Sequence, residues 1–256
     1  MITFTEAQLT TWLSPLLWPF LRTLAVFSSA PLLSSRSFPV RARIALSFLI
    51  AVAAQPSLEG QTVISISSSG AIGAVLQQVG VGLAIGFAIR VVFSAFELAG
   101  EVIGFQMGLN FASFFDPSLN AQTSAIAKFF GQMATFLFIV MNAHLMVLMA
   151  VINSFAAFPV DQNFLQAIGQ MKLYHLGTSI FASGLWIAMP LIGMMMFANF
   201  ALGIVSRVAP QMNIYAIGFP ITLTVGMVGI ASTLPMLDKP FMALLTQAID
   251  IFSVTH

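Results

Sequence analysis

The ionisable residues of this chain that could do chemistry together lie in one predicted helix. Arg90, Glu97 and Glu101 are separated by seven and four residues, so they share one helical face. Such a face could relay protons or ions, or it could pair with neighbouring helices. A relay needs more ionisable groups along its path, and the neighbouring apolar segments offer almost none. We therefore expect Arg90, Glu97 and Glu101 to form ion pairs between helices or subunits.

Glycines recur at intervals of four residues in the same region. Gly82 and Gly86 form one such pair, and Gly100, Gly104 and Gly108 form a longer series. Small residues at this spacing allow two helix backbones to approach each other closely. A phosphate-binding loop would instead require a preceding strand and a lysine, and the sequence predicts neither. We expect Gly82, Gly86 and Gly100 to serve helix packing.

A Phe-rich segment follows and ends at Asp116-Pro117. Core packing would explain its aromatic residues, but it explains the interspersed Gln, Asn and Ser less well. Large apolar side chains on a glycine-containing loop could form a hydrophobic constriction, which closes a pore by excluding water. The candidates for such a constriction are Phe105, Phe111, Phe114 and Phe115. The segment that carries them consists of Gly104, Phe105, Gln106, Met107, Gly108, Leu109, Asn110, Phe111, Ala112, Ser113, Phe114, Phe115 and Asp116.

Composition places the chain among membrane proteins. Hydrophobic residues make up 59% of it and charged residues 7%, against roughly 25% charged residues in soluble domains. The net charge is only +1. Nucleic-acid binding requires clustered Lys and Arg, so no nucleic-acid partner is expected. The start, MITFTEAQL, has no basic region typical of a cleaved signal peptide. We therefore expect the first apolar run to be retained.

No pattern in the sequence indicates an enzyme. The chain has no Cys and three scattered His, which excludes thiolate metal sites and leaves little for a metal centre. No Ser-His-Asp, Cys-His, Walker or dinucleotide-binding arrangement stands out. We expect no catalytic residue, no metal and no cofactor.

Apolar runs broken by prolines and polar turns predict an all-α protein of the membrane type, with hydrophobic hairpins and kinked, broken helices. Crossing a membrane core of ~30 Å takes about 20 apolar residues. A Ser-rich exposed loop is expected at 56–69, a kink at Pro190 and an amphipathic piece at 163–175. The apolar runs are 9–33, 44–54, 70–104, 123–154, 176–206, 214–234 and 241–254.

The last two long runs could form a helical hairpin. The stretch RVAPQMN would make its turn, through Arg207, Pro210, Gln211 and Asn213. Broken helices would also suit a transporter of small solutes or ions, but such a protein needs ionisable groups at the membrane midplane. The long charge-free runs do not supply them.

Three stretches resemble one protein family. They are GEVIGFQMGLNFASFFDP at 100–117, FIVMNAHL at 138–145 and RVAPQMNIYAIGFPI at 207–221. The chain resembles the R subunit of the flagellar type III export gate (the FliR family), which is related to the T subunit of the virulence injectisome. The order of the apolar runs agrees along essentially the whole chain.

This resemblance implies a non-enzymatic subunit of a helical pore assembly in the bacterial inner membrane, at the flagellar basal body. Residues 1–175 would correspond to a P subunit, and residues 176–256 to a Q-subunit hairpin with a C-terminal helix. The loop at 104–116 would project into the channel as a plug. An injectisome gate subunit is the first alternative and a small-solute or ion transporter the second.

The resemblance also implies a set of partners. One copy of the chain would assemble with several P and Q subunits, and the flagellar B and A gate proteins would act on the cytoplasmic side. Unfolded export substrates and membrane lipid complete the expected contacts.

Overall fold

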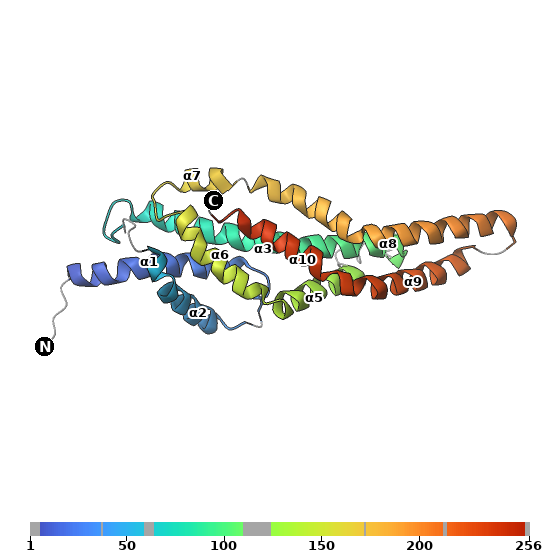
Figure 1. Ribbon diagram of the computed structural model, residues 1–256, viewed down its shortest axis with the longest axis horizontal. Coiled ribbons are helices and arrows are strands. Elements are labelled where there is room, and N and C mark those ends of the chain that lie inside the picture. The colour runs from blue at the N-terminus through green and yellow to red at the C-terminus, as the bar shows by residue number, and fades with distance from the viewer. Residues whose placement is uncertain are drawn as a thin grey trace. The chain divides into compact units, whose positions relative to one another are not determined.

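A computed structural model describes residues 6–36, 38–58, 64–109, 124–171, 173–211 and 214–253. These ranges contain helices and no strand, which confirms the predicted all-α fold (Figure 1). The helices are α1 (Glu6–Ser29), α2 (Val40–Ala53), η1 (Gln55–Leu58), α3 (Ala71–Gln106), α5 (Ala125–Val140), α6 (Ala143–Ala157), α7 (Phe164–Met171), α8 (Tyr174–Val208), α9 (Ile214–Thr233), η4 (Leu234–Met236) and α10 (Asp238–Asp250).

Several of these helices are long and apolar enough to cross a membrane. Within the described ranges they are Ala71–Gln106, Phe164–Val208 across the undescribed residue 172, and Ile217–Met236. The pair α5 and α6 would add a fourth span if the two count as one broken helix. Length and hydropathy therefore agree with the membrane-protein type expected from composition.

Two long helices contain a proline, and an asparagine lies where a third predicted helix is interrupted. α8 continues through Pro190 and α9 through Pro220. The long helix predicted at 123–154 is wrong in one respect, because the structure divides it into α5 and α6. Asn142 lies at the break in the left-handed conformation, with φ 54° and ψ 29°. Asn tolerates this conformation better than most residues because its short side chain can bond locally.

The chain forms two compact units, and α3 contributes to both. One unit comprises Met1–Val91, Ile139–Gly177 and Leu245–His256, and the other comprises Val92–Phe138 and Thr178–Leu244. The division at residue 175 into P-like and Q-like parts rests on resemblance instead of contacts, and it stays a proposal.

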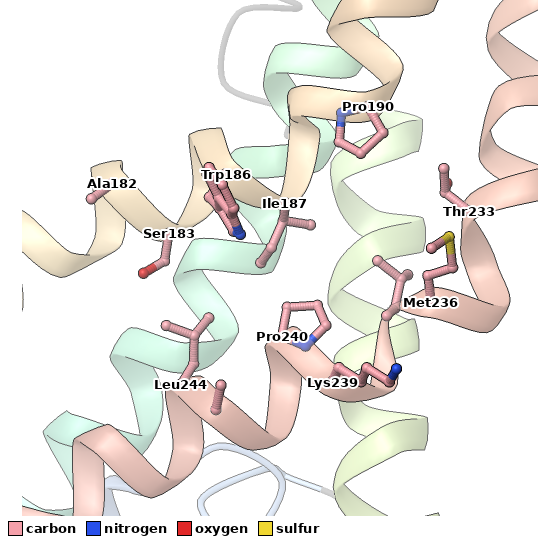
Figure 2. Close-up of a pocket in the computed structure, with 12 residues that line it drawn as sticks. Ala182, Ser183, Trp186, Ile187, Pro190, Thr233, Met236, Lys239, Pro240 and Leu244 are labelled. Atoms are coloured by element: carbon pink, nitrogen blue, oxygen red, sulfur yellow. The ribbon is translucent and has the colours of Figure 1, made fainter.

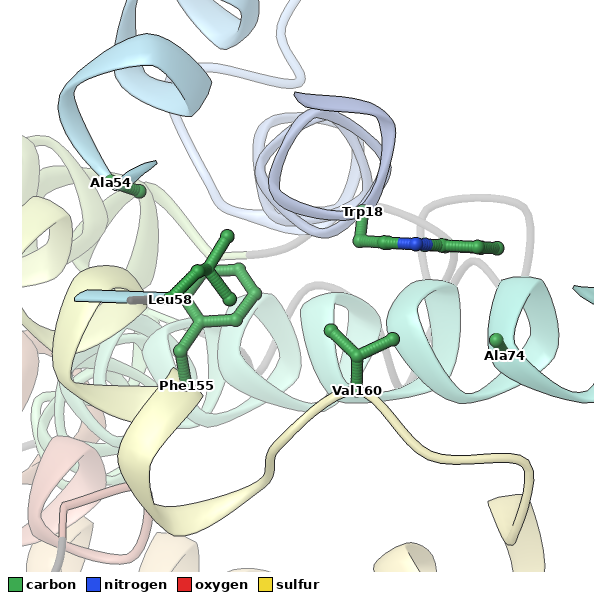
Figure 3. Close-up of a cluster of buried hydrophobic side chains, with 6 residues drawn as sticks. All are labelled: Trp18, Ala54, Leu58, Ala74, Phe155 and Val160. Carbon is green, nitrogen blue, oxygen red and sulfur yellow. The ribbon is translucent and has the colours of Figure 1, made fainter. Parts of the chain in front are cut away.

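The core of the first unit is built around Trp18. Its ring is 1% exposed, and its Nε1–H donates to the carbonyl oxygen of Ile64 at 3.1 Å. Figure 3 shows it with residues from the end of α2, from η1, α3 and α6, and from the loop after α6. These residues are Trp18, Ala54, Leu58, Ala74, Phe155 and Val160.

The core of the second unit is aromatic. Phe93 of α3 lies 5.8 Å from Phe138 of α5 and 6.5 Å from Phe241 of α10, measured between ring centroids. Phe96, one turn further along α3, lies 5.7 Å from Phe241 in an edge-to-face arrangement. Tilted and edge-to-face pairs at these distances are favourable beyond the apolar area that they bury. They hold the C-terminal half of α3 between α5 and α10.

Candidate functional site

Helix α3 ends where the predicted gate segment begins. The Met107 N–H donates to Ile103 O at 2.9 Å, and the Gly108 N–H donates to Phe105 O at 3.0 Å. Gly108 has φ +79°, a left-handed conformation that ends many helices and that glycine adopts without strain. The chain therefore leaves the helical path at Gly108.

The residues at this helix end differ in how far they are buried. Gly104 and Met107 are buried, Met107 completely, whereas the Phe105 side chain is 55% exposed. Gln106, Gly108 and Leu109 are intermediate. The remaining predicted gate residues lie outside the described part of the chain; they are Asn110, Phe111, Ala112, Ser113, Phe114, Phe115 and Asp116.

Helix α9 contacts this end of α3. The Thr222 hydroxyl is positioned to donate to the Met107 carbonyl oxygen at 3.2 Å. A methyl group at Gly226 would lie 2.5 Å from Met107 Cγ, so the missing side chain leaves room for the methionine. Gly108 itself lies near the ring of Phe219.

The three charged residues of α3 each contact a different part of the chain. Arg90 donates from Nη2 to Ser29 O at 3.1 Å, near the end of α1. Glu101 Oε2 accepts the Ser124 N–H at 3.3 Å, directly before α5. A carboxylate at a helix N-terminus interacts favourably with the helix dipole. Glu97 lies exposed beside Gly131 of α5. Pairing of Arg90, Glu97 and Glu101 with other subunits stays a prediction.

The glycines of α3 lie against other helices of the same chain. A methyl group at Gly82 would overlap Arg22 O, and one at Gly86 would overlap the Ser29 hydroxyl, both on α1. A methyl group at Gly100 would lie 2.7 Å from Cα of Ala127 on α5. Close backbone approach therefore occurs at each of the three positions named for packing.

Helices α8 and α9 form an antiparallel hairpin within the second unit (Figure 1). Gly229 faces Met194, and Gly218 faces Leu202 nearer the turn. Arg207 lies in the last turn of α8, with Pro210 and Gln211 beyond its end; Asn213 lies outside the described residues.

Comparison of the sequence with known proteins identifies its family. The model of the family described as bacterial export proteins, family 1, matches residues 13–248. The chain belongs to this family. The flagellar biosynthetic protein FliR of Escherichia coli K12 is 39% identical over 94% of this chain and 92% of its own length. Proteins of the same name from Pectobacterium carotovorum and Bacillus subtilis are 35% and 29% identical, over 99% and 82% of this chain and 97% and 82% of their own lengths.

This member of the export protein family also contains a buried arginine that the sequence reasoning missed. Arg22 of α1 is 0% exposed, and its guanidinium stacks 3.8 Å from the Phe155 ring centroid. It donates to Gln78 Oε1 at 2.9 Å, Ser154 Oγ at 2.9 Å and Phe158 O at 2.7 Å. An ionisable residue inside an apolar run is unusual enough to flag from sequence, and Arg22 interrupts the run at 9–33.

The polar contacts of Arg22 continue into the loop after α6. Gln78 Nε2 donates to Gln77 Oε1 at 2.9 Å, and the same oxygen accepts the Asp161 N–H at 2.8 Å. Gln77 Nε2 donates to Pro159 O at 3.1 Å. We call Arg22, Gln77, Gln78 and Ser154 the polar hub. It ties α1, α3, α6 and the following loop together.

The second unit contains an apolar pocket of about 670 Å³ between α8 and the start of α10. Figure 2 shows Trp186 and Pro190 on the α8 side and Met236 and Pro240 on the other. Lys239 is the charged residue among its described lining. Among the residues that the structure describes, no group of three His, Asp or Glu could hold a metal ion.

Proposed function

We propose that this chain is a non-enzymatic subunit of the flagellar type III export gate in the bacterial inner membrane. Its segment at 104–116 would help to seal the channel through which unfolded flagellar proteins pass. The match to flagellar biosynthetic proteins over nearly the full chain supports the export system. The relatives carry flagellar names, which favours flagellar over virulence export.

The end of α3 supports the proposed position of the seal. Phe105 exposes an apolar ring in the last turn, while Met107 is buried two residues later. The end of α3 therefore has a completely buried side chain, Met107, close to an exposed ring, Phe105, that could line a channel. In this proposal Phe105 acts with Phe111, Phe114 and Phe115, because adjacent apolar rings exclude water and ions from a narrow passage.

Exposed apolar side chains on α8 support assembly with other subunits. Phe181, Trp186, Phe197 and Phe200 are each at least 70% exposed. Several large, exposed apolar side chains on one helix favour contact with lipid or protein. In the proposal, P and Q subunits cover them within a hetero-oligomer that contains one copy of this chain. The flagellar B and A proteins would approach from the cytoplasmic side.

Ion conductance of the assembled gate in a planar bilayer tests the seal. Deleting Gly108–Ser113 should raise the conductance, because the constriction loses its apolar residues. Phe105→Ala should give a smaller rise. Phe136→Ala is the matched control, since that ring is also exposed, 59% against 55% for Phe105, but lies on α5.

Size-exclusion chromatography must show that the deletion complex keeps all its subunits. An intact deletion complex with unchanged conductance would reject the sealing role. Solute-coupled uptake by the purified chain alone would support a transporter instead.

A further inference from the structure

We propose that one face of α9 anchors the base of the gate segment, which we define as Met107 and Gly108. Thr222 and Gly226 are the positioning residues that keep the gate closed. The inference rests on the sealing role proposed for residues 104–116. It adds a structural element, distant in sequence, that holds this segment. Phe219, Thr222 and Gly226 are spaced by three and four residues and so share one helical face.

The hydrogen bond from Thr222 is the first part of the anchor. Met107 O is one of the last carbonyl groups of α3, which have no partner within the helix. Thr222 is 8% exposed, and its hydroxyl lies 3.2 Å from this oxygen. A buried carbonyl without a partner is costly. The α9 hydroxyl therefore stabilises the backbone at the residue where α3 ends.

The same hydroxyl has a second acceptor on its own helix. It lies 3.1 Å from Phe219 O, and one hydroxyl proton serves both carbonyls. If the base of the gate segment moves away, Thr222 can bond fully to Phe219 O, as hydroxyl side chains in helices commonly do. The anchor can therefore release without leaving its donor unpaired, which suits a gate that must open.

The notch at Gly226 is the second part of the anchor. The Met107 side chain is completely buried there. A methyl group at Gly226 would lie 2.7 Å from both Sδ and Cε of Met107. Steric exclusion of this kind fixes the position of a side chain in a packed interior. Gly108, one residue later, then turns the chain away from the helix.

Conductance of the assembled gate tests the hydrogen bond. Thr222→Val keeps the side-chain shape but removes the donor, and we expect about a 2- to 10-fold rise in ion leakage, the range for one net hydrogen bond. Thr222→Ser retains the hydroxyl, so its ion leakage should match that of the unsubstituted gate. Thr224→Val is the matched control, since that exposed hydroxyl donates only within α9, to Pro220 O at 2.8 Å. Equal leakage in all three variants would overturn the anchor.

A double-mutant cycle tests the notch. Gly226→Ala should increase leakage by displacing Met107, and adding Met107→Ala should reverse part of this increase because the methyl group then has room. Gly193→Ala on α8 is the control, with open space at that position. Additive effects of Gly226→Ala and Met107→Ala would show that the two residues do not act through their contact.

Thiol labelling separates failure of the anchor from failure of the sealing role. The chain has no cysteine, so Leu109→Cys is the one thiol of this subunit, and its labelling is read on this subunit's band after the complex is separated by gel electrophoresis. Labelling by a water-soluble maleimide should be faster with Thr222→Val than with Thr224→Val. Unchanged labelling, with a deletion of Gly108–Ser113 that does leak, would reject the anchor and keep the seal. A deletion that does not leak would reject the seal, and with it the role given to the anchor.

Discussion

The two compact units hold their helices together by different polar contacts. In the first unit, the Arg22 guanidinium donates three hydrogen bonds and stacks on Phe155. In the second, the hydrogen bond between α9 and the end of α3 comes from one hydroxyl that two carbonyls share. Charge-assisted hydrogen bonds are about twice as strong as neutral ones. We therefore expect the contacts of Arg22 to hold the first unit more firmly than the shared hydroxyl holds the end of α3 in the second.

The apolar helices also differ in how much of each is buried within the chain. In the most apolar part of α3, 67% of residues are buried within the chain, against 28% for both Phe164–Val208 and Ile217–Met236. Similar hydropathy therefore serves two purposes. α3 forms the chain's own core, whereas α8 and α9 leave most of their apolar side chains unburied within the chain.

The largest effect is expected at the polar hub. Arg22→Leu should lower the free energy of unfolding by at least about 3 kcal/mol, because three buried acceptors lose this donor, at about 1–3 kcal/mol each. Arg43→Leu is the control, since this arginine of α2 has one described acceptor, Leu33 O at 2.8 Å. Circular dichroism of the purified complex during thermal unfolding measures both. A similar small loss in both variants would remove the contrast between a fixed hub and a weaker contact.

An intermediate effect is expected at the helix notches. Gly82→Ala should destabilise the fold by about 1–3 kcal/mol, because the added methyl group overlaps the α1 backbone at Arg22. Gly203→Ala on α8 has open space around it and should instead stabilise the helix by up to about 1 kcal/mol. The midpoint of thermal unfolding should thus shift in opposite directions. Equal shifts would mean that α3 is no more tightly packed than the hairpin.

The smallest effect is expected at the tryptophans. Trp18→Phe removes the hydrogen bond to Ile64 O and should cost about 1 kcal/mol. Trp186→Phe, at a position 72% exposed, should change the stability of the chain by less than about 0.5 kcal/mol. Chemical unfolding in detergent compares the two. A larger loss for Trp186→Phe would show that α8 is packed within the chain itself.

Much of the fold could be predicted from the residues. Long apolar runs predicted the α3 and α8–α9 helices, because crossing a membrane core requires about 20 such residues. The apolar run at 44–54 is too short to cross a membrane core, and α2 ends at Ala53. The break at Asn142 was missed, since nothing in the local apolar pattern marks it. Its left-handed backbone is visible in the structure alone.

The sequence by itself determined the membrane class, the helical fold and the start of the candidate gate segment. Hydropathy, proline and glycine act locally, so their consequences can be read along the chain. The tertiary structure decided which distant residues meet. Arg22 lies 132 residues from Ser154, and Thr222 lies 115 residues from Met107. Such pairs depend on how helices pack, and no local pattern marks a buried hydroxyl on α9 as the partner of the last carbonyls of α3.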